Sequence, residues 1–146
     1  MSDQDQDLDL ISGIAAFESK DFTQALRLLT PRAEGGNAEA QYRLGIIFQN
    51  GLGRVKNELA AYKWMRASAE QGYPLAQHGL GIMYLYGECV TKNEAEAAQW
   101  FLRAAEQNLP GAQMVLGMLY DNGQGVQKDP AEAKRWYDRA TQASPG

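Results

Sequence analysis

Three segments of the chain carry one pattern: AQYRLGIIFQNGLGR at residues 40–54, AQHGLGIMYLYGECV at residues 76–90 and AQMVLGMLYDNGQGV at residues 112–126. Each segment begins 36 residues after the one before it, as the starting positions 40, 76 and 112 show. The three tryptophans, Trp64, Trp100 and Trp136, keep the same spacing. A constant period of this length is typical of proteins built from tandem helical repeats.

Each repeat is expected to form two helices. In the first segment the apolar residues recur at the spacing of one face of an α-helix: Ala40, Leu44, Ile47 and Phe48. Gly51 then suits the left-handed conformation that ends many helices. A second helix is expected after Asn57, Asn93 or Asp129, because each side chain can accept a hydrogen bond from an unpaired backbone N–H. Glutamates three residues later, Glu96 and Glu132, complete the sequence pattern of a capping box in two copies.

A divergent copy precedes the three regular ones, and Ala25 stands in it where Ala61 stands in the next copy. We expect Pro31 to kink or shorten its second helix. The predicted organisation is a disordered acidic tail at residues 1–8 and a single helical-repeat domain at residues 9–143. The repeats are expected at about 9–39, 40–75, 76–111 and 112–143. The fold class is therefore all-α, a right-handed α-solenoid of about four antiparallel helix pairs, because stacked pairs bury the apolar faces that one pair leaves open.

These residues resemble the Sel-1-like repeat family, which is related to the tetratricopeptide repeat. The third copy carries the matching positions: Ala112, Gln113, Leu116, Gly117, Tyr120, Gly123, Gly125, Val126, Asp129, Ala133, Trp136, Tyr137 and Ala140. The second copy has Cys89 at a usual glycine, and the first has Arg54 at the usual valine. The upstream copy is more similar to an ordinary tetratricopeptide repeat. The resemblance covers about residues 9–143.

The resemblance implies binding and no catalysis. Proteins of this kind resemble adaptors, scaffolds or regulators that hold a protein or peptide along a concave face built from the first helix of each pair. Their recurrent positions serve packing and turns, so no catalytic residue is carried over. Some cysteine-rich secreted members are credited with hydrolysing penicillin-like compounds, but they have paired cysteines in every repeat. This chain has only Cys89 and no Ser-x-x-Lys motif, so we expect it not to be an enzyme.

Composition narrows the class of partner. The chain has 146 residues, a net charge of −4 and one cysteine. It therefore has no basic field suited to nucleic acid or to an anionic membrane, and no disulfide can form within it. No stretch approaches the roughly 18 apolar residues of a membrane span. The N-terminal residues are acidic and polar, unlike a secretory signal. We expect a cytoplasmic protein of bacterial type with a protein or peptide partner and no cofactor.

The candidate binding residues lie opposite the packing stripe of each first helix, at about 100° per residue. Unlike the packing positions, they differ from copy to copy, as expected of residues released from the core. The predicted partner-binding set is Tyr42, Ile46, Gln49 and Asn50 in the first copy, His78, Ile82, Leu85 and Tyr86 in the second, and Met114, Met118, Asp121 and Asn122 in the third. An apolar strip edged by aromatic and amide groups suits an extended or helical peptide.

Other interpretations of these residues remain open. Tight curvature could bury Ile46, Ile82 and Met118 against the next helix, or the strip could form a dimer interface. A structural, self-associating protein without a groove ligand is an alternative function. We expect Trp136 and Tyr137 to be partly exposed, with the C-terminal end covered by self-association or by a partner. His78 and Cys89 are too isolated to predict a metal site or an activated nucleophile.

Overall fold

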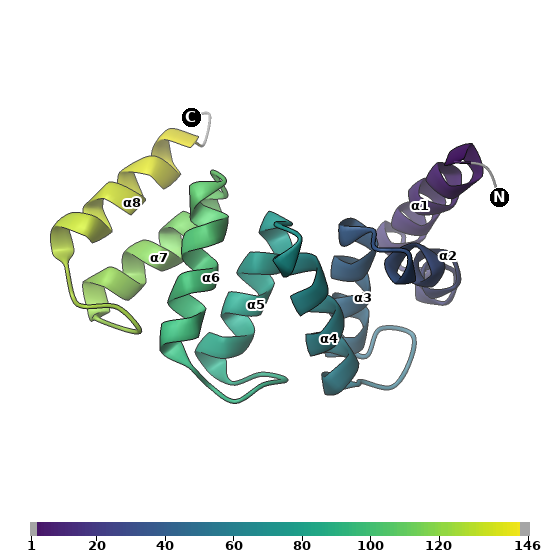
Figure 1. The fold of residues 1–146 in the computed structure, drawn as a ribbon, viewed down its shortest axis with the longest axis horizontal. Coiled ribbons are helices and arrows are strands. Elements are labelled where there is room, and N and C mark those ends of the chain that lie inside the picture. Colours follow the sequence, from purple (N-terminus) through teal and green to yellow (C-terminus); the bar gives the residue numbers. More distant parts are fainter. Residues whose placement is uncertain (1–2, 144–146) are drawn as a thin grey trace. The chain divides into compact units, whose positions relative to one another are not determined.

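The computed structural model describes the backbone of residues 3–143 and the side chains of residues 8–142. Over the described backbone the chain is all α-helix and turn, with no strand. The eight helices are α1 (Asp3–Glu18), α2 (Phe22–Glu34), α3 (Ala38–Asn50), α4 (Glu58–Glu70), α5 (Pro74–Tyr86), α6 (Glu94–Glu106), α7 (Pro110–Asn122) and α8 (Pro130–Ala143). Figure 1 shows them as consecutive pairs joined by loops. The predicted all-α fold is confirmed.

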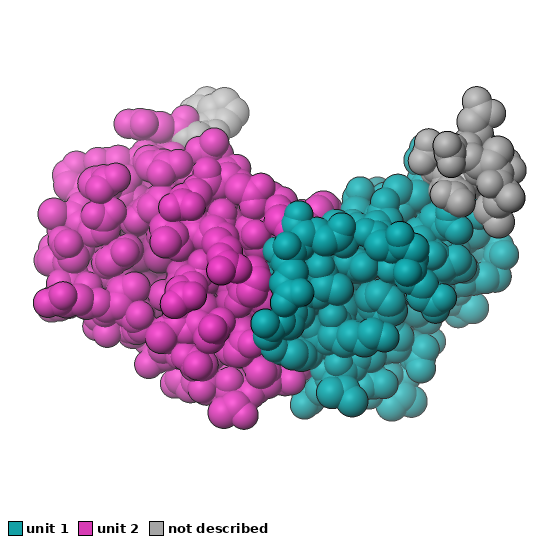
Figure 2. All heavy atoms as spheres, viewed as in Figure 1, with its two compact units in different colours: residues 1–71 teal, residues 72–146 magenta. Residues whose placement is uncertain are grey.

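The helices pack most closely within the pairs α1–α2, α3–α4, α5–α6 and α7–α8. α2 also packs on α3, and α6 on α7. The chain divides into two compact units, Met1–Gln71 and Gly72–Gly146, which Figure 2 colours separately. We call them unit 1 and unit 2 and describe each by itself. The sequence predicted one domain, because its period is the same on both sides of this division.

The helix ends follow the residues that the sequence indicated. The first helices α3, α5 and α7 end at glycines in the left-handed conformation, with φ of 64°, 70° and 66°. Asn57, Asn93 and Asp129 each accept a hydrogen bond from the backbone N–H three residues later. Their own N–H groups donate to the carbonyl groups of Phe48, Tyr84 and Tyr120 at 2.8–2.9 Å. Each cap therefore ties the start of a second helix to the end of the first, and no N–H is left for the glutamate of a reciprocal capping box.

Glutamine side chains add buried polar contacts that the sequence interpretation did not foresee. In unit 1, Gln41 donates to the Ala33 carbonyl at 3.1 Å, and its own oxygen accepts from Gln71 at 2.8 Å. In unit 2, Gln107 donates to Gln77 at 2.9 Å, and Gln113 donates to the Ala105 carbonyl at 3.0 Å. Because a buried amide needs partners, Gln41 and Gln113 hold α3 and α7 against the ends of α2 and α6. Gln71 and Gln107 in turn join the ends of the second helices to the first helices of the same pairs. The recurrence of Gln41, Gln77 and Gln113 at the same repeat position could have indicated these contacts from the sequence.

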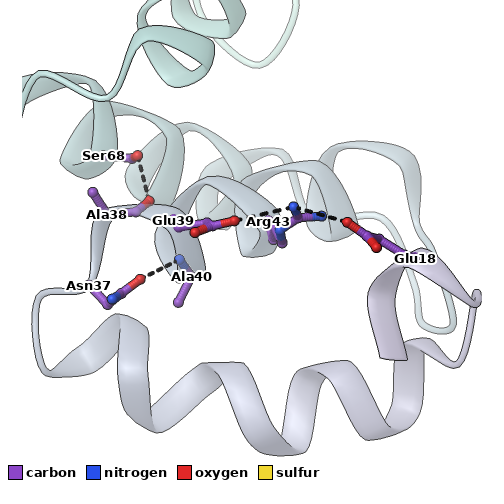
Figure 3. A network of polar contacts seen from close by, with 7 residues as sticks. All are labelled: Glu18, Asn37, Ala38, Glu39, Ala40, Arg43 and Ser68. Atoms are coloured by element: carbon purple, nitrogen blue, oxygen red, sulfur yellow. Dashed lines mark hydrogen bonds and ion pairs between the residues drawn. The ribbon is translucent and has the colours of Figure 1, made fainter. Parts of the chain in front are cut away.

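A polar network ties α3 to both of its neighbours in unit 1, as Figure 3 shows. The Arg43 guanidinium lies 3.3 Å from Glu39 on its own helix and 3.6 Å from Glu18 at the end of α1. At the other end of α3, the buried Ser68 of α4 donates to the Ala38 carbonyl at 2.6 Å. The contacts of Arg43 with Glu18 and of Ser68 with Ala38 fix α3 between α1 and α4, because each of these two joins groups from different helices.

Three expectations differ from the structure. α1 begins at Asp3, so the backbone of residues 3–8 is helical where we predicted a disordered tail. The acidic residues of this segment suit a helix N-terminus, because the helix dipole is positive there. Residues 1–2 of the predicted tail lie outside the described residues. Pro31 does not shorten α2, which has 13 residues like α4 and α6. Trp136 is only 5% exposed, and the Arg139 guanidinium lies 4.5 Å from its ring centroid. Tyr137 is half-buried.

Candidate functional site

The predicted binding residues fall into three classes of exposure. Tyr86 and Met114 are large apolar side chains that are 63% and 49% exposed, and three polar residues are also exposed: Asn50, Asp121 and Asn122. Half-buried residues form the second class: Tyr42, Ile46, Gln49, His78, Ile82 and Met118. Leu85 is the exception, because it is 4% exposed. The interpretation of Ile46, Ile82 and Met118 as fully buried core is therefore not supported, since the core residues Leu44, Leu80 and Leu116 of the same helices are at most 1% exposed.

The prediction for Leu85 is wrong, and its place in the repeat explains why. The equivalent residue of the next copy, Asp121, accepts a hydrogen bond from the Tyr137 hydroxyl of α8 at 3.1 Å. This position therefore faces the second helix of its own pair. In the second copy the matching residues are Leu85 and Phe101, both apolar, so the leucine is buried where the aspartate stays at the surface.

His78 links three helices of unit 2. Its ring packs edge-on against Phe101 of α6, with ring centroids 5.3 Å apart. Its Cε1 atom lies 3.8 Å from the place that a Cβ on Gly111, in the first turn of α7, would occupy. Nδ1 is buried and has no hydrogen-bond partner, and burial lowers the pKa of His78 below its ordinary value. The imidazole is therefore uncharged at neutral pH and presents an apolar, aromatic surface.

The N-terminal parts of α5 and α7 thus lie close together at His78 and Gly111. Along α5, His78 is followed at helical spacing by Ile82 and Tyr86. Leu75, which the sequence interpretation missed, precedes His78 by three residues and is 42% exposed. Leu75 could have been predicted, because it continues the helical spacing of His78, Ile82 and Tyr86 toward the start of α5. We call Leu75, His78, Ile82 and Tyr86 of α5, with Met114 and Met118 of α7, the first-helix strip of unit 2.

Two polar residues of the predicted set, Asp121 and Asn122, make side-chain hydrogen bonds with neighbouring residues. Burial first, and then the hydrogen bond to Asp121, raise the pKa of Tyr137, so its hydroxyl stays protonated and donating. Asn122 donates to Gln124 at 3.2 Å, and Gln124 in turn donates to Glu94 at 3.0 Å. These groups form a polar edge beside the strip and have the character of an interface rim.

The apolar residues at the corresponding positions of unit 1 are less exposed to solvent than Tyr86 and Met114 of unit 2. Tyr42 and Ile46 are half-buried, and the Asn50 amide donates back to the Ile46 carbonyl at 3.0 Å. Burial raises the pKa of Tyr42, while the neighbouring Arg43 partly lowers it. The hydroxyl is therefore neutral at physiological pH. Unit 1 presents one aromatic and one aliphatic side chain on this face, with a polar end at Asn50.

Among the described residues, no group of three or more histidine, cysteine, aspartate or glutamate side chains is placed to hold a metal ion. No helix in residues 3–143 is long and apolar enough to cross a membrane. Cys89 is half-buried in the loop after α5, with φ of 64°. Gly53 and Gly125 occupy the same position in the sister copies, with φ of 68° and 71°.

Replacing Cys89 with glycine is expected to raise the free energy of unfolding by about 0.5–1 kcal/mol. The left-handed conformation costs a residue with a side chain roughly 1–2 kcal/mol, and the added freedom of glycine in the unfolded chain offsets part of the gain. Urea unfolding under reducing conditions measures the change. Asn108→Gly, at φ of 65°, is the matched control. It should gain less, because asparagine tolerates this conformation and its side chain accepts from Arg139 at 3.1 Å. A C89G variant that is less stable than the parent would contradict the argument.

Comparison with known proteins places these features in a family. The model of the Sel1 repeat matches residues 38–73, 74–109 and 110–144. Each matched segment begins two residues before the repeat boundaries that we predicted. No curated protein sequence matches the chain.

Solved structures resemble the chain as well. The crystal structure of a Sel1 repeat protein from Oxalobacter formigenes is 38% identical, with a TM-score of 0.86, over 93% of this chain and 56% of that one. The protective antigen c5321 of uropathogenic Escherichia coli, described as having an SLR fold, is 40% identical with a TM-score of 0.78, over 80% and 25% of the two chains. Cysteine-rich protein B of Helicobacter pylori shares the fold at 20% identity and a TM-score of 0.67, over 85% and 89%.

This chain thus spans about half of the Oxalobacter protein and a quarter of the Escherichia coli protein. Three adjoining family matches cover residues 38–144, well over half of the chain, and their boundaries agree with the helix pairs α3–α4, α5–α6 and α7–α8. The chain belongs to the Sel1 repeat family.

Proposed function

We propose that this protein is a non-enzymatic interaction module that binds a protein or peptide on the exposed faces of its first helices. The observation that carries the proposal is the exposure of Tyr86 and Met114 in unit 2, at 63% and 49%. These large apolar side chains lie on two helices that meet at His78 and Gly111. Exposed aromatic and methionine side chains are typical of interfaces.

The chemistry of the first-helix strip favours an apolar contact surface. The strip carries no charged side chain, because His78 is neutral at physiological pH. Ile82 and Met118 are half-buried and continue the apolar surface along α5 and α7. Asp121 and Asn122 supply a polar edge. An amphipathic segment that lays its apolar face on the strip would remove Tyr86 and Met114 from water, which is the main source of affinity in such contacts.

The double variant Ile82→Ala/Tyr86→Ala tests this proposal. Because Ile82 is half-buried and Tyr86 exposed, we expect the variant to stay folded, with a loss of about 2 kcal/mol or less in the free energy of unfolding. Leu80→Ala in the same helix is the core control. Leu80 is fully buried, so its truncation is expected to cost about 2–5 kcal/mol.

Partner binding is measured by affinity capture from cell extract followed by quantitative mass spectrometry. Proteins captured by the parent chain are expected to be lost with the double variant and kept by Val55→Ala, which removes an exposed apolar side chain from a loop of unit 1. Equal capture by parent and double variant would overturn the proposal. A collapse of stability as large as that of L80A would show instead that Ile82 and Tyr86 are core residues.

A further inference from the structure

A second surface feature lies in unit 1, away from the residues of the first helices discussed above. It is a pocket of about 540 Å³ between α2, α3, the loop after α3, and α4. Its apolar wall includes Leu26, Leu44, Phe48 and Trp64. The volume lies within the range of sites that hold small ligands or a bulky side chain of a partner. We call this feature the unit 1 pocket.

Two arginines stand at the unit 1 pocket, and no acidic residue lines it. The Arg54 guanidinium lies over the Phe48 ring, 4.6 Å from its centroid. Arg27 is held by a hydrogen bond from its Nε to Gln24 at 3.1 Å. Both side chains are exposed, and neither takes part in an ion pair among the described residues. The pocket thus combines an apolar floor with two unpaired positive charges in a chain whose net charge is −4.

Unit 2 contains the same pocket two repeats later, but with different chemistry. There the volume is about 210 Å³. Gln99 and Val126 occupy the positions of Arg27 and Arg54, and Leu102 occupies the position of Thr30. The unit 2 pocket therefore has no charged lining residue. Because the repeat geometry is shared, the size and positive charge of the unit 1 pocket come from its side chains and not from the fold.

We propose that the unit 1 pocket binds an acidic peptide segment, which inserts one bulky apolar side chain between Phe48 and Trp64 and places flanking carboxylates against Arg27 and Arg54. The apolar wall accounts for the inserted side chain. Charge complementarity accounts for the carboxylates, since the guanidinium group pairs readily with them. Trp64 is half-buried and already has a cation beside it, the Lys63 ammonium 4.6 Å from its ring centroid, which adds to the attraction for an anionic segment.

The test uses the intact chain and an acetylated, amidated hexapeptide in which phenylalanine and leucine are flanked by two acidic residues on each side. Calorimetric titration measures its affinity, and a matched peptide carries the corresponding amides in place of the acids. We expect the acidic peptide to bind more tightly. Arg27→Gln and Arg54→Val, which introduce the residues of the unit 2 pocket, should together weaken the acidic peptide about tenfold and leave the amide peptide unchanged. Both positions are exposed, so thermal unfolding should confirm that these variants fold normally.

Two further readouts decide where the peptide binds. The indole N–H signal of Trp64 in the NMR spectrum is expected to shift on titration, while those of Trp100 and Trp136 stay in place. Arg103→Gln removes the same charge outside the pocket and should not change the affinity. The proposal is overturned if neither peptide binds, if the amide peptide binds equally well, if R103Q weakens binding as much as the pocket variants, or if the shift falls on Trp100 or Trp136. The I82A/Y86A variant should bind the acidic peptide like the parent, which separates this site from the first-helix strip.

Discussion

Replacing Gly125 with alanine is expected to lower the free energy of unfolding by about 3 kcal/mol. Gly125 has φ of 71°, and a Cβ at this position would overlap the carbonyl group of Glu94 in the first turn of α6. The left-handed conformation costs a residue with a side chain roughly 1–2 kcal/mol, and overpacking against neighbours costs about 1–3 kcal/mol. The obstacle is backbone, so no side-chain rotation can relieve it. The loop after α7 must move away from α6.

Urea unfolding followed by circular dichroism measures the loss. Gly35→Ala is the matched control, since the backbone of Gly35 is right-handed helical with φ of −78° and its added Cβ would approach nothing closer than 3.4 Å. The control should change the free energy of unfolding by less than about 1 kcal/mol. Equal losses for G125A and G35A would show that the loop after α7 is free to move.

Gly81→Ala is expected to cost about 2–3 kcal/mol, because overpacking in a rigid core is not easily relieved. The added Cβ would lie 2.9 Å from two ring carbons of Phe101. The Phe101 ring is fully buried, and the ring of His78 packs against it. The alanine therefore forces α5 and α6 apart, which removes contact along both helices.

The sister glycines provide a graded control for this effect. At Gly117 the added Cβ would lie 2.6 Å from Tyr137, but this ring is half-buried and can turn toward solvent if its bond to Asp121 is given up. At Gly45 the nearest atom is the flexible end of Met65 at 3.1 Å. The expected order of loss, measured by thermal unfolding, is G81A, then G117A, then G45A. A loss for G45A as large as that for G81A would contradict the role of side-chain mobility.

Most of the fold could be predicted because its signals are local. The helix-ending glycines Gly51, Gly87 and Gly123 and the caps Asn57 and Asn93 act within a few residues of their own position. A period of 36 residues then repeats these local signals in register. The candidate face could be predicted in outline for the same reason, since helical spacing decides which residues share a side.

The wrong predictions concern residues whose burial or conformation depends on contacts with other parts of the structure. Leu85 is buried because its position faces the second helix of its own pair, where Phe101 lies in this copy. Pro31 is accommodated within α2, which continues to Glu34 with the Gly35 N–H bonded to the Pro31 carbonyl at 3.0 Å. Trp136 is covered without a further repeat. None of these outcomes follows from the spacing of residues within one helix.

By itself the sequence determined the number of helix pairs and the ends of the three regular ones, since turns and caps are made by neighbouring residues. Only the tertiary structure decided the division into two units, which residues of the first helices stay exposed, and the existence of the unit 1 pocket. The pocket joins side chains as distant as Arg27 and Trp64. The repeat geometry recurs in unit 2, so the size and charge of the unit 1 pocket depend on which side chains three helices and a loop bring together. Such contacts between elements are not recorded by any periodicity within one element.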